Sequence, residues 1–320
     1  MSMARKALMV LPALFSVAAV AADYPDRPVR LVVPFPPGGG TDYLARTVGQ
    51  KLGERLGQQF VIDNRPGGGG IAATEMIARA NADGYTLLLS FNGQLAASPH
   101  LEKVTYDAAR DFAAVSMIGA SYHMLVAHPS LAVKNVRQLI DLAQAKSGAF
   151  NFASSGLGTN PHLVGEMFKL AAKIDMVHVP YKGTGPAAVA VLAGESQLMF
   201  SNLTAVLQPV RTSRLTGLAV TRPRRSPLAP DVPTMNESGV VGLEVESWFV
   251  LLAPAATPRA VTAKLNAEVA RIAATPDYRA LLEKNGFDVL TSKPEAFPPF
   301  VRAEYEKWGR IIRAAGIRSQ

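Results

Sequence analysis

Short apolar runs alternate with amphipathic stretches along most of the chain. Residues 29–33 form one such run, and after a glycine-rich turn the segment 41–56 carries a leucine or valine at every fourth position from residue 44 onward. Four-residue spacing places side chains on one face of a helix, whereas short runs rich in valine, leucine and phenylalanine are typical of strands. Helical spacing returns at 258–274 and 294–315. Further strand-like runs stand at 60–63, 85–90, 150–153, 176–179, 198–201 and 215–220. The alternation predicts an α/β fold whose mostly parallel sheets are flanked by helices.

Two further extended apolar runs, near 118–126 and 247–253, are candidate crossings between two lobes. If both cross, lobe 1 contains residues 23–125 plus 246–320, and lobe 2 is the inserted segment 126–245. Ligands of open α/β sheets bind beyond the carboxyl ends of the strands. The cleft between the lobes is therefore the expected site.

Residues 1–22 have the pattern of a cleavable secretory signal. Arg5 and Lys6 precede an apolar run over residues 7–20, and small residues follow at 19–21. The run is shorter than the roughly 20 apolar residues needed to span a bilayer. We therefore expect export to the periplasm as a protein that is not embedded in the membrane. The sequence contains no cysteine, so disulfides and thiolate metal sites are excluded.

The charge of the chain does not indicate a nucleic-acid partner. Removing Arg5 and Lys6 from the 33 basic residues leaves 31 against 25 acidic residues, a balance of +6. The densest basic group, 222–225, lies in a proline-rich bend without interleaved aromatic residues. The five histidines, at positions 100, 123, 128, 162 and 178, lack the spacing of a helical metal pair. We expect no metal and no cofactor.

A first loop, residues 34–42, joins the first predicted strand to the first predicted helix. Its glycines allow a ligand to approach the backbone closely, and the N–H groups at a helix start bind anions. A tight turn without a ligand is the alternative. The sequence matches neither the dinucleotide-binding pattern nor the P-loop. The candidate ligand contacts here are Phe35, Pro36, Gly38, Gly39, Thr41 and Asp42.

A second loop, residues 154–162, repeats the arrangement with hydroxyl and amide side chains. The candidate contacts here are Ser154, Ser155, Gly156, Thr159 and Asn160. An exported hydrolase with a serine nucleophile and His162 is the enzymatic alternative, but the Gly-x-Ser-x-Gly pattern is not satisfied. We therefore expect a binding protein without catalytic residues. Weaker candidates at other strand ends and turns are Asn92, Tyr181, Lys182, Ser201 and Asn202. The loop 64–70 is interpreted as a structural turn, with a further anion loop as the alternative.

Several motifs in order along the chain carry a family resemblance. Residues 24–30 lead into the first loop, and Asp63-Asn64-Arg65-Pro66-Gly67, Ala82-Asp83-Gly84-Tyr85, Ser154-Ser155-Gly156 and Pro180-Tyr181-Lys182-Gly183 follow. Together they resemble the Bug proteins, the solute receptors of tripartite tricarboxylate transporters. The likeness extends from Tyr24 to the C-terminus.

The resemblance implies a two-lobed type II periplasmic binding protein that closes on its ligand like a Venus flytrap. A small carboxylate is then held by the first loop on one side and the second loop on the other, and is delivered to a membrane transporter. Docking of the loaded receptor on a sensor's exported domain is the alternative, and a monomer is expected in either case. The family often has Asp where this chain has Ser201, before Asn202. The missing charge favours a ligand without an ammonium group.

Overall fold

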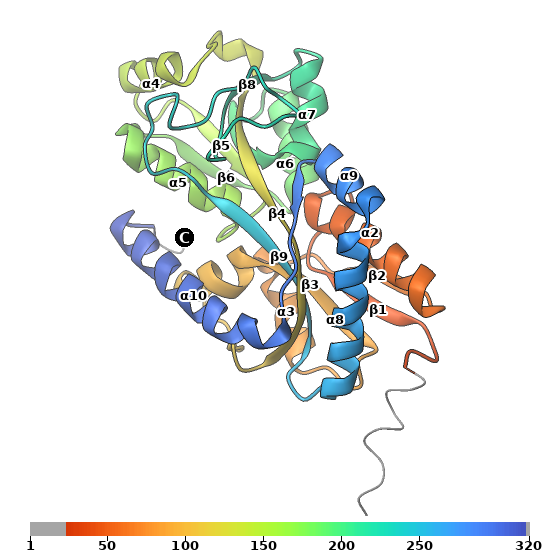
Figure 1. The fold of residues 1–320 in the computed structure, drawn as a ribbon. Helices are drawn as coiled ribbons and strands as arrows, with labels where there is room; N and C mark the ends of the chain where they lie inside the picture. Colours follow the sequence, from red (N-terminus) through yellow and green to blue (C-terminus); the bar gives the residue numbers. More distant parts are fainter. Residues whose placement is uncertain (1–23, 318–320) are drawn as a thin grey trace, which may run out of the picture.

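The computed structural model describes residues 24–317, and the expected signal segment, residues 1–22, lies outside this range (Figure 1). In lobe 1, β1 pairs in parallel with β2 on one side and with β3 on the other. The strands of this lobe are β1 (Val29–Val33), β2 (Phe60–Asn64), β3 (Thr86–Phe91), β9 (Glu246–Pro254) and β10 (Phe287–Val289). Its helices are α2 (Gly40–Leu56), α3 (Ile71–Ala78), α8 (Arg259–Ala274), α9 (Pro276–Lys284) and α10 (Phe297–Ala314).

Lobe 2 repeats the parallel arrangement on a smaller scale. In it β5 pairs in parallel with β6 and with β7. Its strands are β5 (Asn151–Ser154), β6 (Val177–Pro180), β7 (Leu198–Asn202) and β8 (Thr216–Val220), and its helices are α4 (Val136–Ala145), α5 (Asn160–Ala172), α6 (Thr184–Leu192) and α7 (Leu203–Arg211). The proline-rich segment 222–233, which includes the basic group 222–225, is irregular.

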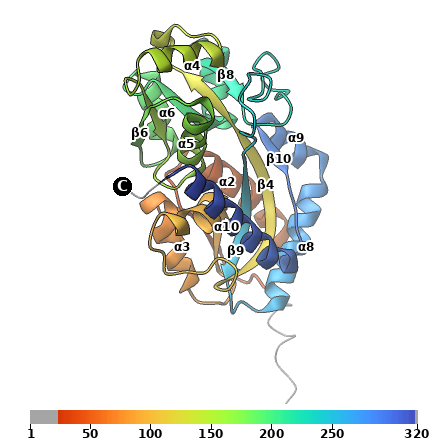
Figure 2. The same cartoon turned by 90° about the vertical axis from the view of Figure 1, so that its left-hand side faces the viewer.

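One long strand, β4 (Phe112–Ala127), connects the two lobes (Figures 1 and 2). Residues 112–122 of β4 pair with β9, whereas residues 123–127 pair with β7 and β8. Every pair that involves β4 or β9 is antiparallel. The lobes therefore share one mixed sheet of strand order β2-β1-β3-β9-β4-β7-β5-β6. The parallel pairing predicted from the sequence is confined to the two outer ends of that sheet.

The first predicted helix shows how the hydrophobic pattern positions the first loop. The side chains of Leu44, Val48 and Leu52 are fully buried in the core of lobe 1. The helix ends at Gly57, whose φ of 72° is the left-handed conformation in which glycine commonly terminates helices. Burial of this stripe fixes α2 against the sheet, and the N-terminus of α2 then lies at the carboxyl end of β1.

The C-terminal part of the chain differs from the expected two helices. A separate helix, α9, begins at Pro276, because a proline is favoured in the first turn of a helix and ends the preceding one. The helix predicted over 294–315 begins with a short 3₁₀ turn and continues as α10. Trp308 and Ile312 of α10 belong to the same buried cluster as Phe168 of lobe 2. The last helix therefore packs against both lobes.

Candidate functional site

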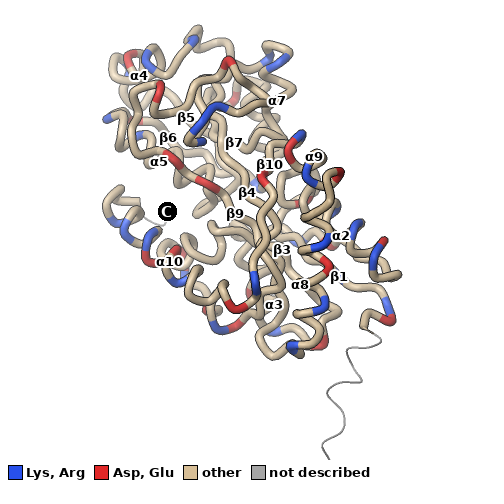
Figure 3. The backbone as a smooth tube through the Cα atoms, viewed as in Figure 1, with Lys and Arg blue, Asp and Glu red and all other residues tan. Residues whose placement is uncertain are grey.

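A cavity of about 460 Å³, including the part open to solvent, lies where the two lobes meet. Both predicted loops and four strands, β3, β4, β7 and β9, contribute to its wall. The lining residues are Phe35, Gly39, Gly40, Thr41, Phe91, Ser121, His123, Ser155, Asn160, Pro161, Thr184, Asn202, Ser247 and Phe249. Lys, Arg, Asp and Glu are spread over both lobes (Figure 3), but none of the lining residues is of these types. The cavity wall is polar and aromatic without a formal charge.

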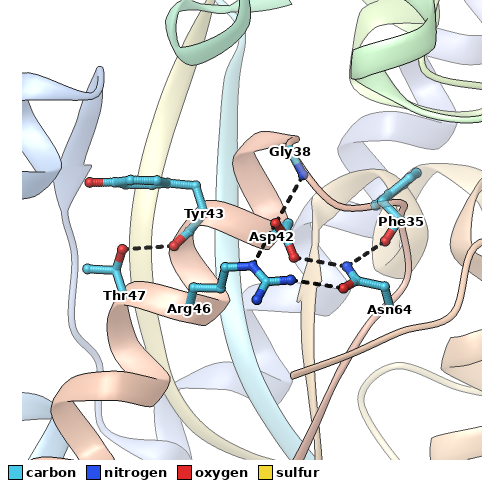
Figure 4. Close-up of polar contacts among 7 residues, drawn as sticks. All are labelled: Phe35, Gly38, Asp42, Tyr43, Arg46, Thr47 and Asn64. Carbon is cyan, nitrogen blue, oxygen red and sulfur yellow. Dashed lines mark hydrogen bonds and ion pairs between the residues drawn. The ribbon is translucent and has the colours of Figure 1, made fainter. Parts of the chain in front are cut away.

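The first loop is held in shape by the Asp42 carboxylate (Figure 4). One carboxylate oxygen accepts hydrogen bonds from the Gly38 N–H and from Arg46 Nε, both at 3.0 Å. The other accepts from Asn64 Nδ2 at 2.9 Å, and the same amide nitrogen donates to the Phe35 carbonyl oxygen. Asp42 is therefore a support of the loop backbone, and it does not line the cavity.

The pKa of Asp42 follows from these contacts. Burial alone would raise it, but the hydrogen bonds from Arg46, the Gly38 N–H and Asn64 outweigh burial and lower the pKa below its ordinary value. The carboxylate is thus ionised at neutral pH and compensated by its neighbours. The N-terminus of α2 lies at the cavity beside Asp42. The first N–H groups of a helix have no intrahelical partner, so those of α2 are available to a ligand.

The second loop is held in shape by neutral groups. Ser154 Oγ lies 2.6 Å from His178 Nε2, and the Thr159 hydroxyl donates to the Gly156 carbonyl oxygen at 2.6 Å. The Gly158 N–H donates to His162 Nδ1 at 3.2 Å. Burial lowers the pKa of His162 to about 4 and that of His178 to about 3, so both rings are neutral at pH 7.

Two residues of the second loop are left to face the cavity. The Ser155 hydroxyl makes no side-chain hydrogen bond within residues 24–317, and Ser155 lines the cavity together with Asn160. The Asn160 amide nitrogen donates to Asn92 Oδ1 at 2.7 Å and to the Ser247 hydroxyl. Asn92, a predicted contact, thus orients Asn160 rather than lining the cavity itself.

The structure divides the predicted site residues into two groups. Those that line the cavity are Phe35, Gly39, Thr41, Ser155, Asn160 and Asn202. Those outside its lining are Pro36, Gly38, Asp42, Asn92, Ser154, Gly156, Thr159, Tyr181, Lys182 and Ser201. Lys182 has an exposed side chain, and the Tyr181 hydroxyl lies 3.4 Å from the Ser196 hydroxyl. Ser201 pairs with Met124 and lies on the opposite face of the sheet from Asn202, since neighbours on a strand alternate.

Sequence analysis overlooked the polar residues on the crossing strands. Ser121 and His123 stand two positions apart on β4, and Ser247 lies opposite Ser121 on β9. Asn202 lies opposite His123 on β7. Directly opposed residues of antiparallel strands share a face, so these four side chains face the cavity together. Asn202 was among the predicted contacts, whereas the signal for Ser121 and His123 is a pair of polar residues at alternate positions within an otherwise apolar run.

The geometry gives no support to the hydrolase alternative. In the second loop, the serine that meets a histidine is Ser154, its partner is His178 rather than His162, and the Ser154 side chain is fully buried outside the cavity lining. No acidic group orients the imidazole, because His178 Nδ1 has no hydrogen-bond partner within residues 24–317. Over the same residues, no group of three or more His, Asp or Glu side chains is placed to hold a metal ion. Nor is any helix there long and apolar enough to cross a membrane.

Comparison with known proteins agrees with this architecture. Residues 44–317 match the model of the tripartite tricarboxylate transporter family receptor. BugT of Bordetella pertussis is 35% identical over 304 residues, covering 94% of this chain and 93% of BugT.

Solved structures show the same fold. The periplasmic binding protein BugD is 32% identical, with a TM-score of 0.88 over 93% of this chain and all of that chain. Rpa4515 of R. palustris, solved with adipate, is 35% identical, with a TM-score of 0.90 over 93% of this chain and all of that one. The predicted two-lobed periplasmic binding protein fold and the predicted resemblance to Bug proteins are both confirmed. The chain belongs to the family of tripartite tricarboxylate transporter receptors.

Proposed function

We propose that the protein is a periplasmic receptor that captures a small carboxylate between its lobes and delivers it to a tripartite tricarboxylate transporter. The observation that carries the proposal is the meeting of two helix N-termini, those of α2 and α5, at one uncharged cavity. Each N-terminus attracts an anion through its free N–H groups and its dipole. The adipate bound to the related Rpa4515 supports a carboxylate as the ligand class.

The magnitudes are sufficient for a useful affinity. A helix N-terminus contributes about 0.3–1 kcal/mol to an exposed anion and up to about 2 kcal/mol to a partly buried one. A hydrogen bond to a charged group contributes about 1.5–3 kcal/mol. Two helix starts, with the hydroxyls of Thr41 and Ser155 beside them, can therefore supply the roughly 8 kcal/mol of a micromolar site.

The absence of an acidic side chain from the cavity lining restricts the ligand further. An ammonium group in this cavity would be desolvated without a counter-charge, which is strongly unfavourable. The lining therefore favours carboxylates without an ammonium group. Asp42 lies near the cavity but does not offer a counter-charge to an ammonium group, because its carboxylate accepts hydrogen bonds from Gly38 and Arg46.

Contacts across the lobe junction support a receptor that signals occupancy by closure. A Cβ added to Gly183 would lie 2.9 Å from Pro36 of the first loop, and one added to Gly69 would lie 2.7 Å from the Leu157 carbonyl oxygen of the second loop. A ligand held by groups from both lobes binds this arrangement in preference to a more open one and shifts the population toward it. A transporter that recognises the closed form then receives loaded receptor.

The test is calorimetric titration of protein isolated from a periplasmic extract, stripped of ligand by unfolding and refolding, with a panel of carboxylates. We expect binding to at least one carboxylate class, and roughly 10-fold weaker binding in Thr41→Val and in Ser155→Ala. Lys182→Ala is the matched control and should bind as tightly as the unmodified protein. Unchanged affinity in both Thr41→Val and Ser155→Ala, or no carboxylate binding at all, would refute the proposal.

A further inference from the structure

A short strap of lobe 1, residues 285–288, contacts lobe 2 outside the cavity lining. The strap belongs to lobe 1, because it continues into β10, which pairs with the part of β4 in that lobe. Its neighbours in lobe 2 are the first two residues of α7. The Thr204 hydroxyl donates to the Asn285 carbonyl oxygen at 3.0 Å, and a Cβ added to Gly286 would lie 2.8 Å from Leu203 Cβ. Separating the lobes at this point would break the hydrogen bond and open the packing.

The other end of the strap forms an ion pair between the lobes. Arg222, which follows β8 of lobe 2, donates to both carboxylate oxygens of Asp288 at 3.0–3.2 Å. The same guanidinium lies 4.7 Å from the centre of the Tyr122 ring on β4. An arginine that meets both oxygens of a carboxylate requires one distance and one orientation. The pair is therefore satisfied at the lobe angle of this structure and is lost when that angle changes.

This ion pair lies on the face of the sheet that is turned away from the cavity. Tyr122 stands between Ser121 and His123, whose side chains face the cavity, and neighbours on a strand point to opposite faces. The Tyr122 ring and the Arg222 guanidinium above it are thus behind the strands that connect the lobes. Neither Arg222 nor Asp288 lines the cavity. Any effect of Arg222 on ligand affinity must therefore act through the lobe angle.

The strap also contacts the first turn of α2, where the first loop ends. The Phe287 ring stacks on the Tyr43 ring, with centroids 5.8 Å apart and planes 8° from parallel. Asn285 Nδ2 donates to the Tyr43 hydroxyl at 2.7 Å, and a Cβ added to Gly40 would lie 3.1 Å from Phe287 Cζ. One side of the strap thus packs against the helix start at the cavity, and the other side packs against lobe 2.

We propose that Arg222 and Thr204 are positioning residues, which hold the strap against lobe 2 and stabilise the closed arrangement before a ligand binds. The apparent affinity of a ligand is proportional to the share of protein already in the arrangement that binds it. Loss of either contact lowers this share, so the ligand has to supply the difference. The proposal goes beyond the proposed function, because neither residue contacts the ligand.

The test measures the separation of the lobes in the ligand-stripped protein. Because the sequence contains no cysteine, Val61→Cys on β2 and Val189→Cys on α6 place one spin label on each lobe, at two exposed side chains. Double electron–electron resonance then gives the distribution of distances between the labels, and the distance calculated from this structure marks the closed arrangement. We expect Arg222→Ala and Thr204→Val each to lower the share of closed protein severalfold.

Two matched controls remove the same kinds of contact within lobe 2 alone. Arg225 forms an ion pair with Glu237 at 3.0 Å, in the same proline-rich segment as Arg222. The Thr212 hydroxyl donates to the Gln208 carbonyl oxygen at the end of α7. Arg225→Ala and Thr212→Val should give the distance distribution of the labelled parent protein. Melting curves establish that all four variants fold.

Distance distributions in Arg222→Ala and Thr204→Val that match those of the controls would refute the proposal. Calorimetric titration with the carboxylate of the panel that binds most tightly provides a second measurement. Its affinity should fall by the same factor as the share of closed protein. An affinity that stays unchanged while this share falls would also refute the proposal. Failure of every carboxylate to bind the unmodified protein refutes the proposed function, and the distance measurement then decides on the strap alone.

Discussion

The two loops that meet at the cavity look alike in sequence but are stabilised in different ways. Each joins a strand to a helix through glycine, and each places hydroxyl residues at the helix start. The first loop depends on the ionised carboxylate of Asp42 and its contacts with Arg46 and Asn64. The second depends on neutral hydrogen bonds of Ser154 and Thr159, with two buried neutral histidines. The first loop is therefore stabilised by an ionised carboxylate, whereas the second is stabilised by hydrogen bonds between neutral groups.

This difference separates the support of a loop from its contact with a ligand. In each loop, the side chain that could act as an acid, base or nucleophile instead hydrogen-bonds to the backbone of the loop. This side chain is Asp42 in the first loop and Ser154, paired with His178, in the second. The side chains that face the cavity carry neutral hydroxyl donors, those of Thr41 and Ser155. Backbone N–H groups and hydroxyls bind an anion without bringing a counter-charge, so such a cavity can release its ligand again.

Acidification should give the largest effect and should act first through the buried histidines, two of which support the second loop. As the pH falls below about 6.5, histidines of the unfolded chain take up protons. The buried rings of His123, His162 and His178 do not, because burial lowers their pKa to about 4, 4 and 3. The unfolded state then binds more protons, so the free energy of unfolding decreases by up to about 1.4 kcal/mol per pH unit for each histidine.

The first loop should lose stability only at lower pH. Because the pKa of Asp42 is lowered, its contribution to the free energy of unfolding is present above pH about 3.9 and is lost as the pH falls through the folded-state pKa.

The histidine prediction is measured by urea unfolding at intervals between pH 7 and 4, which gives the slope of the free energy of unfolding against pH. His123→Gln should reduce this slope by the share of one histidine. A free energy of unfolding that stays constant between pH 6.5 and 4.5 would contradict the assignment of neutral, buried rings.

Removing the support of each loop should have unequal effects at neutral pH. Asp42→Ala takes an ionised acceptor from Gly38, Arg46 and Asn64, and we expect a loss of about 2–3 kcal/mol in the free energy of unfolding. Ser154→Ala removes a neutral partner from His178, and about 1 kcal/mol is expected. Urea unfolding at pH 7 measures both, with Lys182→Ala as a variant that should not change stability. Equal losses would show that charge does not distinguish the loops.

The sequence predicted what depends on neighbouring residues and missed what depends on strand register. Both loops follow from local turn and helix-start patterns, and Thr41 and Ser155 were identified with them. The partners of Asp42 and Ser154 were not predicted, because Asn64 and His178 lie on other strands, 22 and 24 residues further along. The polar face of β4 was missed for the same reason. Only antiparallel pairing brings His123 opposite Asn202, and no local pattern reports that register.

The smallest expected effect concerns the point where lobe 1 touches the second loop. Gly69 and Gly57 both have left-handed backbone conformations, with φ of 61° and 72°, so alanine at either position costs about 1–2 kcal/mol in stability. A Cβ at Gly57 meets nothing within 4 Å, whereas one at Gly69 would lie 2.7 Å from the Leu157 carbonyl oxygen across the lobe junction.

Because the two glycines share a left-handed conformation, we expect similar losses of thermal stability in Gly57→Ala and Gly69→Ala. Ligand affinity should fall severalfold in Gly69→Ala alone, because the added methyl opposes the closed arrangement that the ligand selects. Calorimetric titration and melting curves on both variants measure the two effects separately, and equal ligand affinities would show that the second loop reaches its ligand without this contact.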